Sequence, residues 1–196
     1  MADPFREVTG KKDEHWDLLE SFIRVGSRWV TLIGERWRCD KGKTLEYWRV
    51  EKADSVIVLP LQEGHILCPK ETFRPGVGRP TLDFPGGRLP TGMEPAEVVP
   101  DLLDRELGVS SEAIVKIEQI NAMPLLINSS FSNQRLWGYA ATIDEAYMVP
   151  EQHMHKKFPT TETGLDHLLQ RMECLQCRAL LLDWTRKHTE ESLSLR

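Results

Sequence analysis

Charged side chains and glycines gather in residues 82–109, LDFPGGRLPTGMEPAEVVPDLLDRELGV, and such a mixture can bind a metal ion or a phosphate. Positions i, i+3 and i+4 of a helix share one face, so Leu102, Arg105 and Glu106 become neighbours if this segment is helical. Mg²⁺ prefers carboxylate oxygens and water. A guanidinium about 5 Å from Mg²⁺ repels it by roughly 6 to 7 kcal/mol at an effective dielectric of 20. Because this face carries one acid and one base, we expect it to bind metal weakly.

Other carboxylates nearby provide an alternative metal site. Pro100 favours a helix that begins near Val99 with the proline in its first turn. Glu94 and Glu97 then lie in the preceding loop, which can bend toward a cleft. A rearranged site would take its ligands from this loop, the helix and the glycines before it, namely Glu94, Glu97, Glu106 and the carbonyl oxygen of Gly86.

Arginines surround the same glycine-rich segment. Arg74 and Arg79 flank the loop RPGVGR, and Arg88 follows Gly86 and Gly87. A guanidinium can donate two parallel hydrogen bonds to a phosphate group. The sequence therefore predicts phosphate-binding roles for these side chains and for the helical arginine: Arg74, Arg79, Arg88 and Arg105. The alternative for each loop arginine is a solvated side chain without a ligand.

The spacing of these residues resembles the Nudix box. That pattern is a Gly, five residues, a Glu, seven residues, then Arg-Glu-apolar-any-Glu-Glu-any-Gly-apolar. It fits residues 87–109 without a gap. Four charged positions differ, because this chain has other residues where the family has Glu, Arg, Glu and Glu: Met93, Asp101, Leu102 and Arg105. Of the box carboxylates Glu106 remains, so the resemblance implies that Mg²⁺-dependent hydrolysis is lost or strongly weakened.

Beyond the box, residues 28–142 resemble the ADP-ribose pyrophosphatase branch of the family, through RWVTLIGERWRCDKGKTLEYWRVEKADSVIVLPL, ETFRPGVG and TLDFPGG. The resemblance implies an α+β Nudix fold, with a mixed β-sheet sandwiched between helices. Residues 1–50 would form an N-terminal helix and a hairpin, and residues 51–196 a Nudix domain with a C-terminal helix. In this branch the hairpin often exchanges between subunits, which implies a homodimer. Arg74 falls where the branch has an arginine that contacts substrate phosphate.

The pattern of apolar residues predicts the flanking elements. Helical spacing of Trp16, Leu19, Phe22 and Ile23 predicts a helix over residues 13–24. β-Branched and aromatic runs around a glycine-bearing turn at residues 40–43 predict a hairpin, followed by a buried strand at residues 55–61. A broad apolar face predicts a C-terminal helix over residues 164–187.

Cys174 and Cys177 form a C-x-x-C within that C-terminal helical stretch. A structural zinc site needs four ligands, and no second pair of this kind stands nearby in the sequence. His153 and His155 are too weak a cue to complete one. We therefore expect two reduced thiols at neighbouring helix positions.

The composition favours a soluble globular protein over a nucleic-acid-binding or membrane-spanning one. Hydrophobic residues make up 40% of the chain and charged residues 28%, as in soluble globular domains. A formal charge of -5 argues against a general nucleic-acid binder, which needs a basic surface. The chain has no run of about 18 apolar residues that would span a membrane. Its first residues lack the apolar core of a signal peptide, so we expect a cytoplasmic protein.

These observations leave three functions open. The leading one is a protein that binds a nucleotide diphosphate, or a protein partner, and uses Arg105 in place of a metal ion. The second is an active hydrolase of a nucleoside diphosphate linked to another moiety, with Mg²⁺ or Mn²⁺ as cofactor at the rearranged site. The third is a structural or RNA-binding scaffold, against which the acidic charge weighs.

Overall fold

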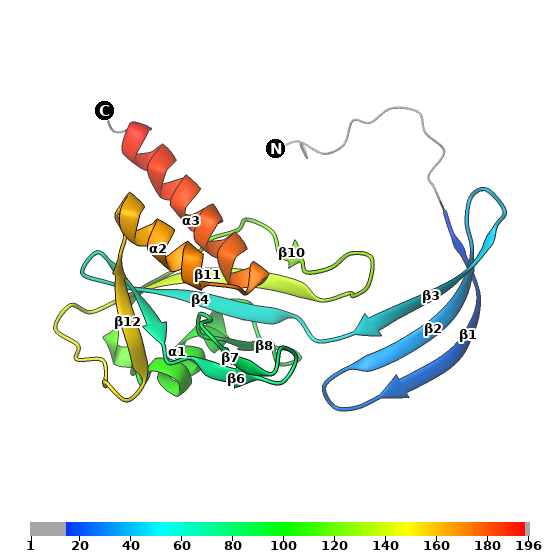
Figure 1. The fold of residues 1–196 in the computed structure, drawn as a ribbon, viewed down its shortest axis with the longest axis horizontal. Helices are drawn as coiled ribbons and strands as arrows, with labels where there is room; N and C mark the ends of the chain where they lie inside the picture. Colours follow the sequence, from blue (N-terminus) through cyan, green and yellow to red (C-terminus); the bar gives the residue numbers. More distant parts are fainter. Residues whose placement is uncertain (1–14, 195–196) are drawn as a thin grey trace. The chain divides into compact units, whose positions relative to one another are not determined.

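The computed structural model describes residues 15–194, which divide into two compact units (Figure 1). The hairpin unit comprises residues 15–52 together with the loop 128–133. The sheet unit comprises residues 53–127 and 134–194. No helix of the described residues is both long enough and apolar enough to cross a membrane.

The hairpin unit is an antiparallel sheet in the order β1-β2-β3, with strands at Asp17–Gly26, Thr31–Arg38 and Thr44–Glu51. The hairpin predicted around residues 40–43 is confirmed, since β2 and β3 pair on either side of it. Gly42 has φ 74° there, a left-handed conformation that favours glycine. The loop 128–133 joins this unit, because the amide of Val50 donates to the carbonyl of Phe131 at 2.8 Å.

The helix predicted over residues 13–24 is wrong for the part that the structure describes. Residues 17–26 form strand β1. Its pairing with β2 shifts register between Leu18 and Glu20 and again between Ser21 and Ile23. Such bulges interrupt the alternation of a strand. The apolar side chains of β1 therefore recur at intervals of three and four residues, which imitates a helix in the sequence.

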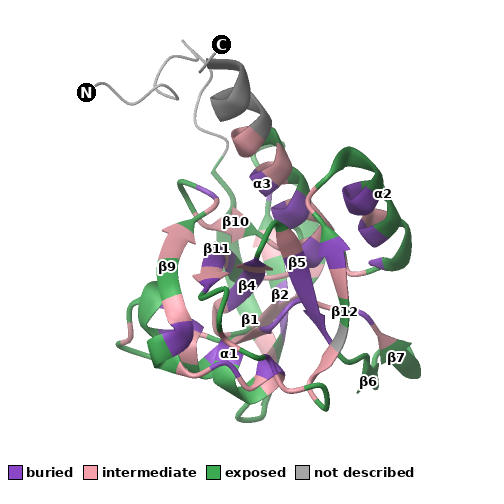
Figure 2. Cartoon of the chain, turned by 90° about the vertical axis from the view of Figure 1, so that its left-hand side faces the viewer, coloured by how far each residue is buried: buried purple, intermediate pink, exposed green. Residues whose placement is uncertain are grey.

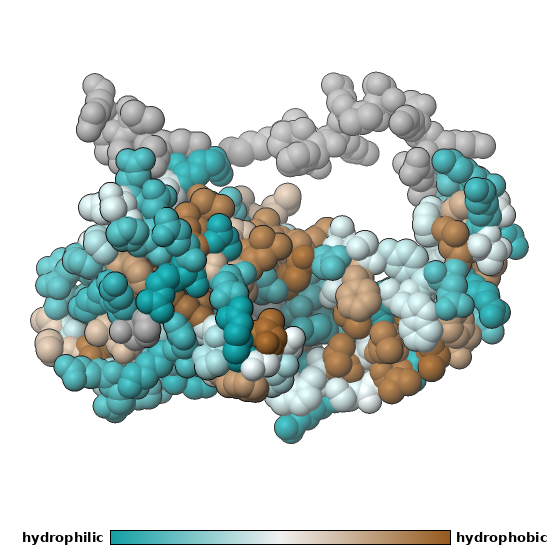
Figure 3. Space-filling model, in the orientation of Figure 1, coloured by the Kyte–Doolittle hydropathy of each residue, from teal (hydrophilic) through white to brown (hydrophobic). Residues whose placement is uncertain are grey.

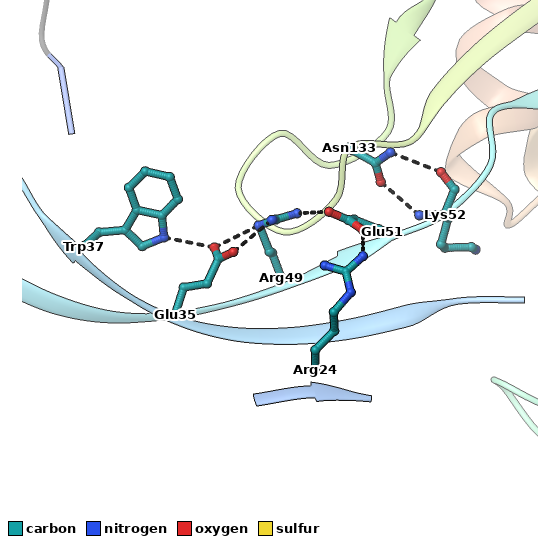
Figure 4. A network of polar contacts seen from close by, with 7 residues as sticks. All are labelled: Arg24, Glu35, Trp37, Arg49, Glu51, Lys52 and Asn133. Carbon is teal, nitrogen blue, oxygen red and sulfur yellow. Dashed lines mark hydrogen bonds and ion pairs between the residues drawn. The ribbon is translucent and has the colours of Figure 1, made fainter. Parts of the chain in front are cut away.

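A chain of charged hydrogen bonds runs through the hairpin unit (Figure 4). The Arg49 guanidinium donates two bonds of 2.9 Å to Glu35, whose side chain is 3% exposed. It donates a third, of 3.0 Å, to Glu51, which also accepts 2.6 Å from Arg24. Trp37 donates its indole N–H to Glu35 at 3.0 Å. These bonds hold the pKa of Glu35 below its ordinary value, and those from Arg49 have the largest effect. Burial acts in the opposite direction but is outweighed.

The sheet unit is built on a seven-stranded mixed sheet. Its central pair, β4 and β11, is parallel, with Leu136 opposite Ser55 and Thr142 opposite Leu61. The other pairings are antiparallel. The strands, in chain order, are β4 Ser55–Gln62, β5 His65–Pro69, β8 Gly86–Arg88, β9 Ile114–Gln119, β10 Leu125–Leu126, β11 Arg135–Ile143 and β12 Met154–Pro159. A small separate hairpin holds β6 Thr72–Arg74 and β7 Arg79–Thr81.

Helices cover both faces of this sheet (Figures 1 and 2). Successive residues of a strand point to opposite faces, so β4 contributes to two cores. Val56 and Val58 pack toward α1, Val99–Leu107, whereas Ile57 and Leu59 pack toward the helices on the other face. Those helices are α2 Glu162–Arg171 and α3 Leu175–Ser194. Short 3₁₀ turns at η1 Pro95–Val98 and η2 Ser111–Ala113 flank α1.

The single C-terminal helix predicted over residues 164–187 is in fact two helices. The chain leaves the helical conformation at Met172, whose φ is -87° and ψ 112°, and whose side chain is buried in the core. Arg178 reaches back from α3 and donates to the carbonyls of Leu169 and Met172. A guanidinium on the last carbonyls of a helix stabilises its end. The break therefore has a specific cap, and it places Cys174 just before α3.

Replacing Glu35 by Gln should lower the free energy of unfolding of the hairpin unit by about 2 to 4 kcal/mol, because Arg49 loses its buried partner. Because the folded-state pKa of Glu35 is depressed, its contribution is complete above the ordinary value of about 4.5 and is lost as pH falls through the depressed pKa. The Gln variant should lack this acid-sensitive contribution. Urea unfolding followed by tryptophan fluorescence measures both effects.

Fluorescence reports mainly on this unit because four of the six tryptophans belong to it, namely Trp16, Trp29, Trp37 and Trp48. The control is Glu46→Gln, since Glu46 also accepts an indole N–H, from Trp48 at 2.8 Å, on the exposed surface. That change should alter stability by less than about 0.5 kcal/mol. Equal losses in the two variants would show that the network does not stabilise the unit.

Candidate functional site

The glycines of the box segment allow α1 to lie very close to β8. Gly86 and Gly87 pair with Ile57 and Val56 of β4. A Cβ atom at Gly87 would lie 2.8 Å from Cδ2 of Leu102 and 3.4 Å from Nη2 of Arg105. A contact of 2.8 Å between carbon atoms is too short, so a larger residue here would force the Leu102 side chain, or the helix that carries it, to move. Glycine at this position therefore permits the close approach of the helix to the strand.

Helix α1 begins at Val99 with Pro100 in its first turn, as the sequence predicted. It ends at Gly108, which has φ 66°. The Gly108 amide donates to the carbonyl of Asp104 at 2.8 Å, as expected for a glycine helix cap. Leu102 is 3% exposed and belongs to the core. Position 102, a carboxylate in the family pattern, is thus an apolar core residue here.

Arg105 lies between the Gly86 carbonyl oxygen and the Glu106 carboxylate, which the sequence analysis predicted as metal ligands. Its Nη2 donates to the Gly86 carbonyl oxygen at 2.9 Å and to Oε1 of Glu106 at 2.5 Å. The Gly86 amide approaches the same Oε1 at 3.4 Å. The side chain of Glu106 is 23% exposed and that of Arg105 58% exposed. A guanidinium nitrogen therefore occupies the space between the Gly86 carbonyl and the Glu106 carboxylate.

A cavity of about 340 Å³ opens beside this group. Arg105, Glu106 and Arg74 line it, together with Lys70 and His153. Lys70 and His153 meet because β5 and β12 are paired neighbours, and the Lys70 amide donates to the His153 carbonyl at 3.0 Å. With three permanent cations and one carboxylate in its wall, the cavity favours anions.

The structure keeps the remaining predicted residues apart from this cavity. Arg79 forms an ion pair with Glu173 through two hydrogen bonds. Arg88 is exposed at the end of β8. Glu94 and Glu97 are exposed at the start of η1, where the Glu97 carboxylate accepts the Glu94 amide at 3.0 Å. None of these four residues lines the cavity.

Lys70 and His153 are the residues that the sequence prediction missed. They lie 83 positions apart and share no motif. Their proximity depends on the antiparallel pairing of β5 with β12, which the irregular composition before β12 concealed. The sequence could have revealed these two residues only through a prediction that β5 and β12 pair.

A second cavity, of about 230 Å³, lies beside Gly86 and Gly87 and is lined by Arg74, Cys174 and Cys177 among others. Both cysteines are free, but the prediction that both occupy helix positions is wrong for Cys174, which lies just before α3. A hydrogen bond from Cys177 lowers the pKa of Cys174 to about 6. The same bond, with burial, raises the pKa of Cys177. The hydrogen bond between the two thiols therefore favours deprotonation of Cys174 over that of Cys177.

No family model and no curated protein matches the chain. Among solved structures, it is similar to one described as the crystal structure of an ADP compounds hydrolase. The TM-score is 0.73 and the identity 14%, and the match covers 93% of this chain and 98% of the other. At that identity the likeness shows the fold alone. It confirms the α+β Nudix fold, with a mixed sheet between helices, that the sequence led us to expect.

Proposed function

We propose that the protein binds the diphosphate group of a nucleotide without a metal ion and does not hydrolyse it. One observation carries this proposal: the Arg105 guanidinium bridges the Gly86 carbonyl and the Glu106 carboxylate. A divalent cation at this place would need both oxygens and would meet a positive charge. Arg105 thus supplies the charge that a cation would otherwise bring to the phosphate.

The hydrogen-bonding capacity of Arg105 supports this role. A guanidinium has five N–H donors, and Nη2 uses its two on Gly86 and Glu106. The three remaining donors, on Nε and Nη1, have no acceptor within residues 15–194. Because the side chain is more than half exposed, these donors can reach an anion in the cavity.

The rest of the cavity wall suits the same ligand. Lys70 and Arg74 add two permanent positive charges to the wall. Arg74 is held in place because its Nε donates to Oδ2 of Asp83 at 2.8 Å. Charge-assisted hydrogen bonds from such groups to phosphate oxygens are about twice as strong as neutral ones. The solved structure of similar fold is described as a hydrolase of ADP compounds, which suggests an ADP-containing ligand.

An active hydrolase is the second candidate, because Gly86 and Glu106 still direct two oxygens at one point. If Arg105 swung away, Mg²⁺ or Mn²⁺ could bind there and generate the hydroxide that diphosphate hydrolysis requires. Glu94 and Glu97 would have to leave the start of η1 to add ligands. Two protein oxygens without further carboxylates form a weak Mg²⁺ site, so we rank this function second.

We further propose that the protein is a homodimer joined through the hairpin unit. Directly paired residues of an antiparallel sheet point to the same side. Leu32 pairs with Val25, and Gly34 pairs with Ile23 and with Trp48, so these side chains share one face. All four apolar side chains are exposed, from 38% at Leu32 and Ile23 to 58% at Val25. Figure 3 shows apolar side chains gathered over this sheet, a surface typical of protein interfaces.

ADP-ribose is expected to bind in calorimetry without added metal, and its Kd should be the same in Mg²⁺ and in EDTA. Arg105→Ala should raise the Kd roughly tenfold or more, because a hydrogen bond to a charged group contributes about 1.5 to 3 kcal/mol. Arg135→Ala is the matched control, since Arg135 is exposed and lies outside the cavity. Binding that requires Mg²⁺, or that survives Arg105→Ala unchanged, contradicts the proposal.

AMP should not be released from ADP-ribose at high protein concentration with Mg²⁺ or Mn²⁺. A guanidinium cannot produce the metal-bound hydroxide, so charge alone does not restore hydrolysis. The measurement is a time course of AMP by chromatography, with Glu106→Gln as the control for a contaminating enzyme. Metal-dependent release that disappears in Glu106→Gln would instead establish the second candidate.

Light scattering should give a mass of twice 22.5 kDa for the wild-type protein. Leu32→Glu should reduce it to the monomer mass, because a charge would be buried in the apolar interface. The control is Val115→Glu, since Val115 is 66% exposed on β9 of the sheet unit. A monomeric wild-type protein, or a dimer unaffected by Leu32→Glu, would exclude this interface.

A further inference from the structure

Three potential metal ligands converge in the sheet unit outside the cavity that contains Arg105. One carboxylate oxygen of Asp83 and the Sγ atoms of Cys174 and Cys177 all lie within 4.8 Å of one another. Asp83 lies between β7 and β8, and the two cysteines lie at the start of α3. All three line the cavity of about 230 Å³.

The break between α2 and α3 produces this arrangement. Cys174 precedes α3, and its carbonyl accepts the amide of Arg178 at 3.0 Å in the first turn of the helix. Cys177 lies in that first turn and accepts the Phe84 amide at 3.4 Å. The same Arg178 fixes the end of α2 through the Leu169 and Met172 carbonyls. Both thiols are therefore held beside residues 83 and 84 by backbone contacts.

The unpaired carboxylate oxygen of Asp83 is independent evidence that a cation binds here. Its Oδ2 accepts hydrogen bonds from Arg74 at 2.8 Å and from Thr81 at 2.9 Å. Its Oδ1 is buried and has no hydrogen-bond partner among the described residues. A buried carboxylate oxygen without a partner is costly, and native proteins rarely leave one so. A cation coordinated by this carboxylate would remove that cost.

The ligand types select the ion. Thiolates are soft ligands that favour zinc and disfavour Mg²⁺. In a tetrahedral zinc site, bonds of about 2.3 Å to sulfur and 2.0 to 2.2 Å to oxygen place neighbouring ligand atoms roughly 3.5 to 3.8 Å apart. The separations here, within 4.8 Å, need to close by about 1 Å or less, which side-chain rotation can provide.

Charge balance also fits zinc. Two thiolates and a carboxylate carry one more negative charge than Zn²⁺ neutralises. Arg74, bonded to Oδ2 of Asp83, supplies the missing positive charge. As each Zn–S bond forms, a thiol still protonated releases its proton to solvent, so zinc displaces protons without any oxidant.

We propose that Asp83, Cys174 and Cys177 bind one zinc ion, with its fourth coordination position open to the cavity and filled by water. Zinc sites with three protein ligands and one open position can accept a ligand from solution. The site lies beside Gly86 and Gly87 but uses none of the oxygens that Arg105 contacts. The two proposed sites share Arg74, which lines both cavities, but they have no ligand atom in common.

The test uses the full chain, reduced and stripped of metal by EDTA. Zinc titrated against a chromogenic chelator should bind one ion per chain, and Co²⁺ should give a thiolate charge-transfer band with tetrahedral d–d absorption. Cys174→Ser should lose about half of the band's intensity, because one of two thiolates is removed, and should weaken zinc binding at least tenfold. Serine is a favoured residue before a helix, so this variant is expected to fold. Circular dichroism confirms that it does.

Asp83→Asn should retain the charge-transfer band but weaken zinc binding at least tenfold. Cys39→Ser is the matched control, because Cys39 is a buried free cysteine of the hairpin unit, and it should bind zinc like the wild type. Zinc should also slow alkylation of Cys174 by iodoacetamide. Absence of the Co²⁺ band, wild-type affinity in folded Cys174→Ser or Asp83→Asn, or alkylation that is insensitive to zinc would each overturn the proposal.

Discussion

The close contact between β8 and α1 at Gly87 determines the chemistry of this protein more than any single charge. Because glycine at position 87 leaves room for Leu102, helix α1 can lie against β8. Arg105 of this helix then lies beside the Gly86 carbonyl oxygen and donates to it. The Gly86 carbonyl and the Glu106 carboxylate therefore face the same cation. The sequence determines whether this cation is a metal ion or a side chain.

A guanidinium and a metal ion are unequal substitutes. Both supply positive charge to a phosphate, and the guanidinium does so at every metal concentration because it is covalently attached. A metal ion also lowers the pKa of bound water to generate a nucleophile, which a guanidinium cannot do. The guanidinium also ties up the acceptors, since Arg105 bonds to both Gly86 and Glu106. In the proposed function, ligand binding is therefore independent of a metal ion, whereas hydrolysis would require one.

Local sequence signals predicted the features that depend on backbone shape, and failed where distant segments meet. Pro100 predicted the start of α1, and the glycine-bearing turn predicted the β2–β3 hairpin. Strand β1 was mistaken for a helix because two bulges disturb its alternation. The break at Met172 was missed because the apolar pattern continues through it, while its cap comes from Arg178. The ion pair of Arg79 with Glu173 joins residues 94 positions apart, which no local pattern encodes.

The parallel pairing of β4 with β11 has a consequence for synthesis of the chain. Each residue of β4 faces a residue 81 positions later, so the nascent strand waits roughly 4 to 16 s for this neighbour at ribosomal rates. During that time SVIVLPLQ offers an unsatisfied, apolar edge that could pair with another nascent chain.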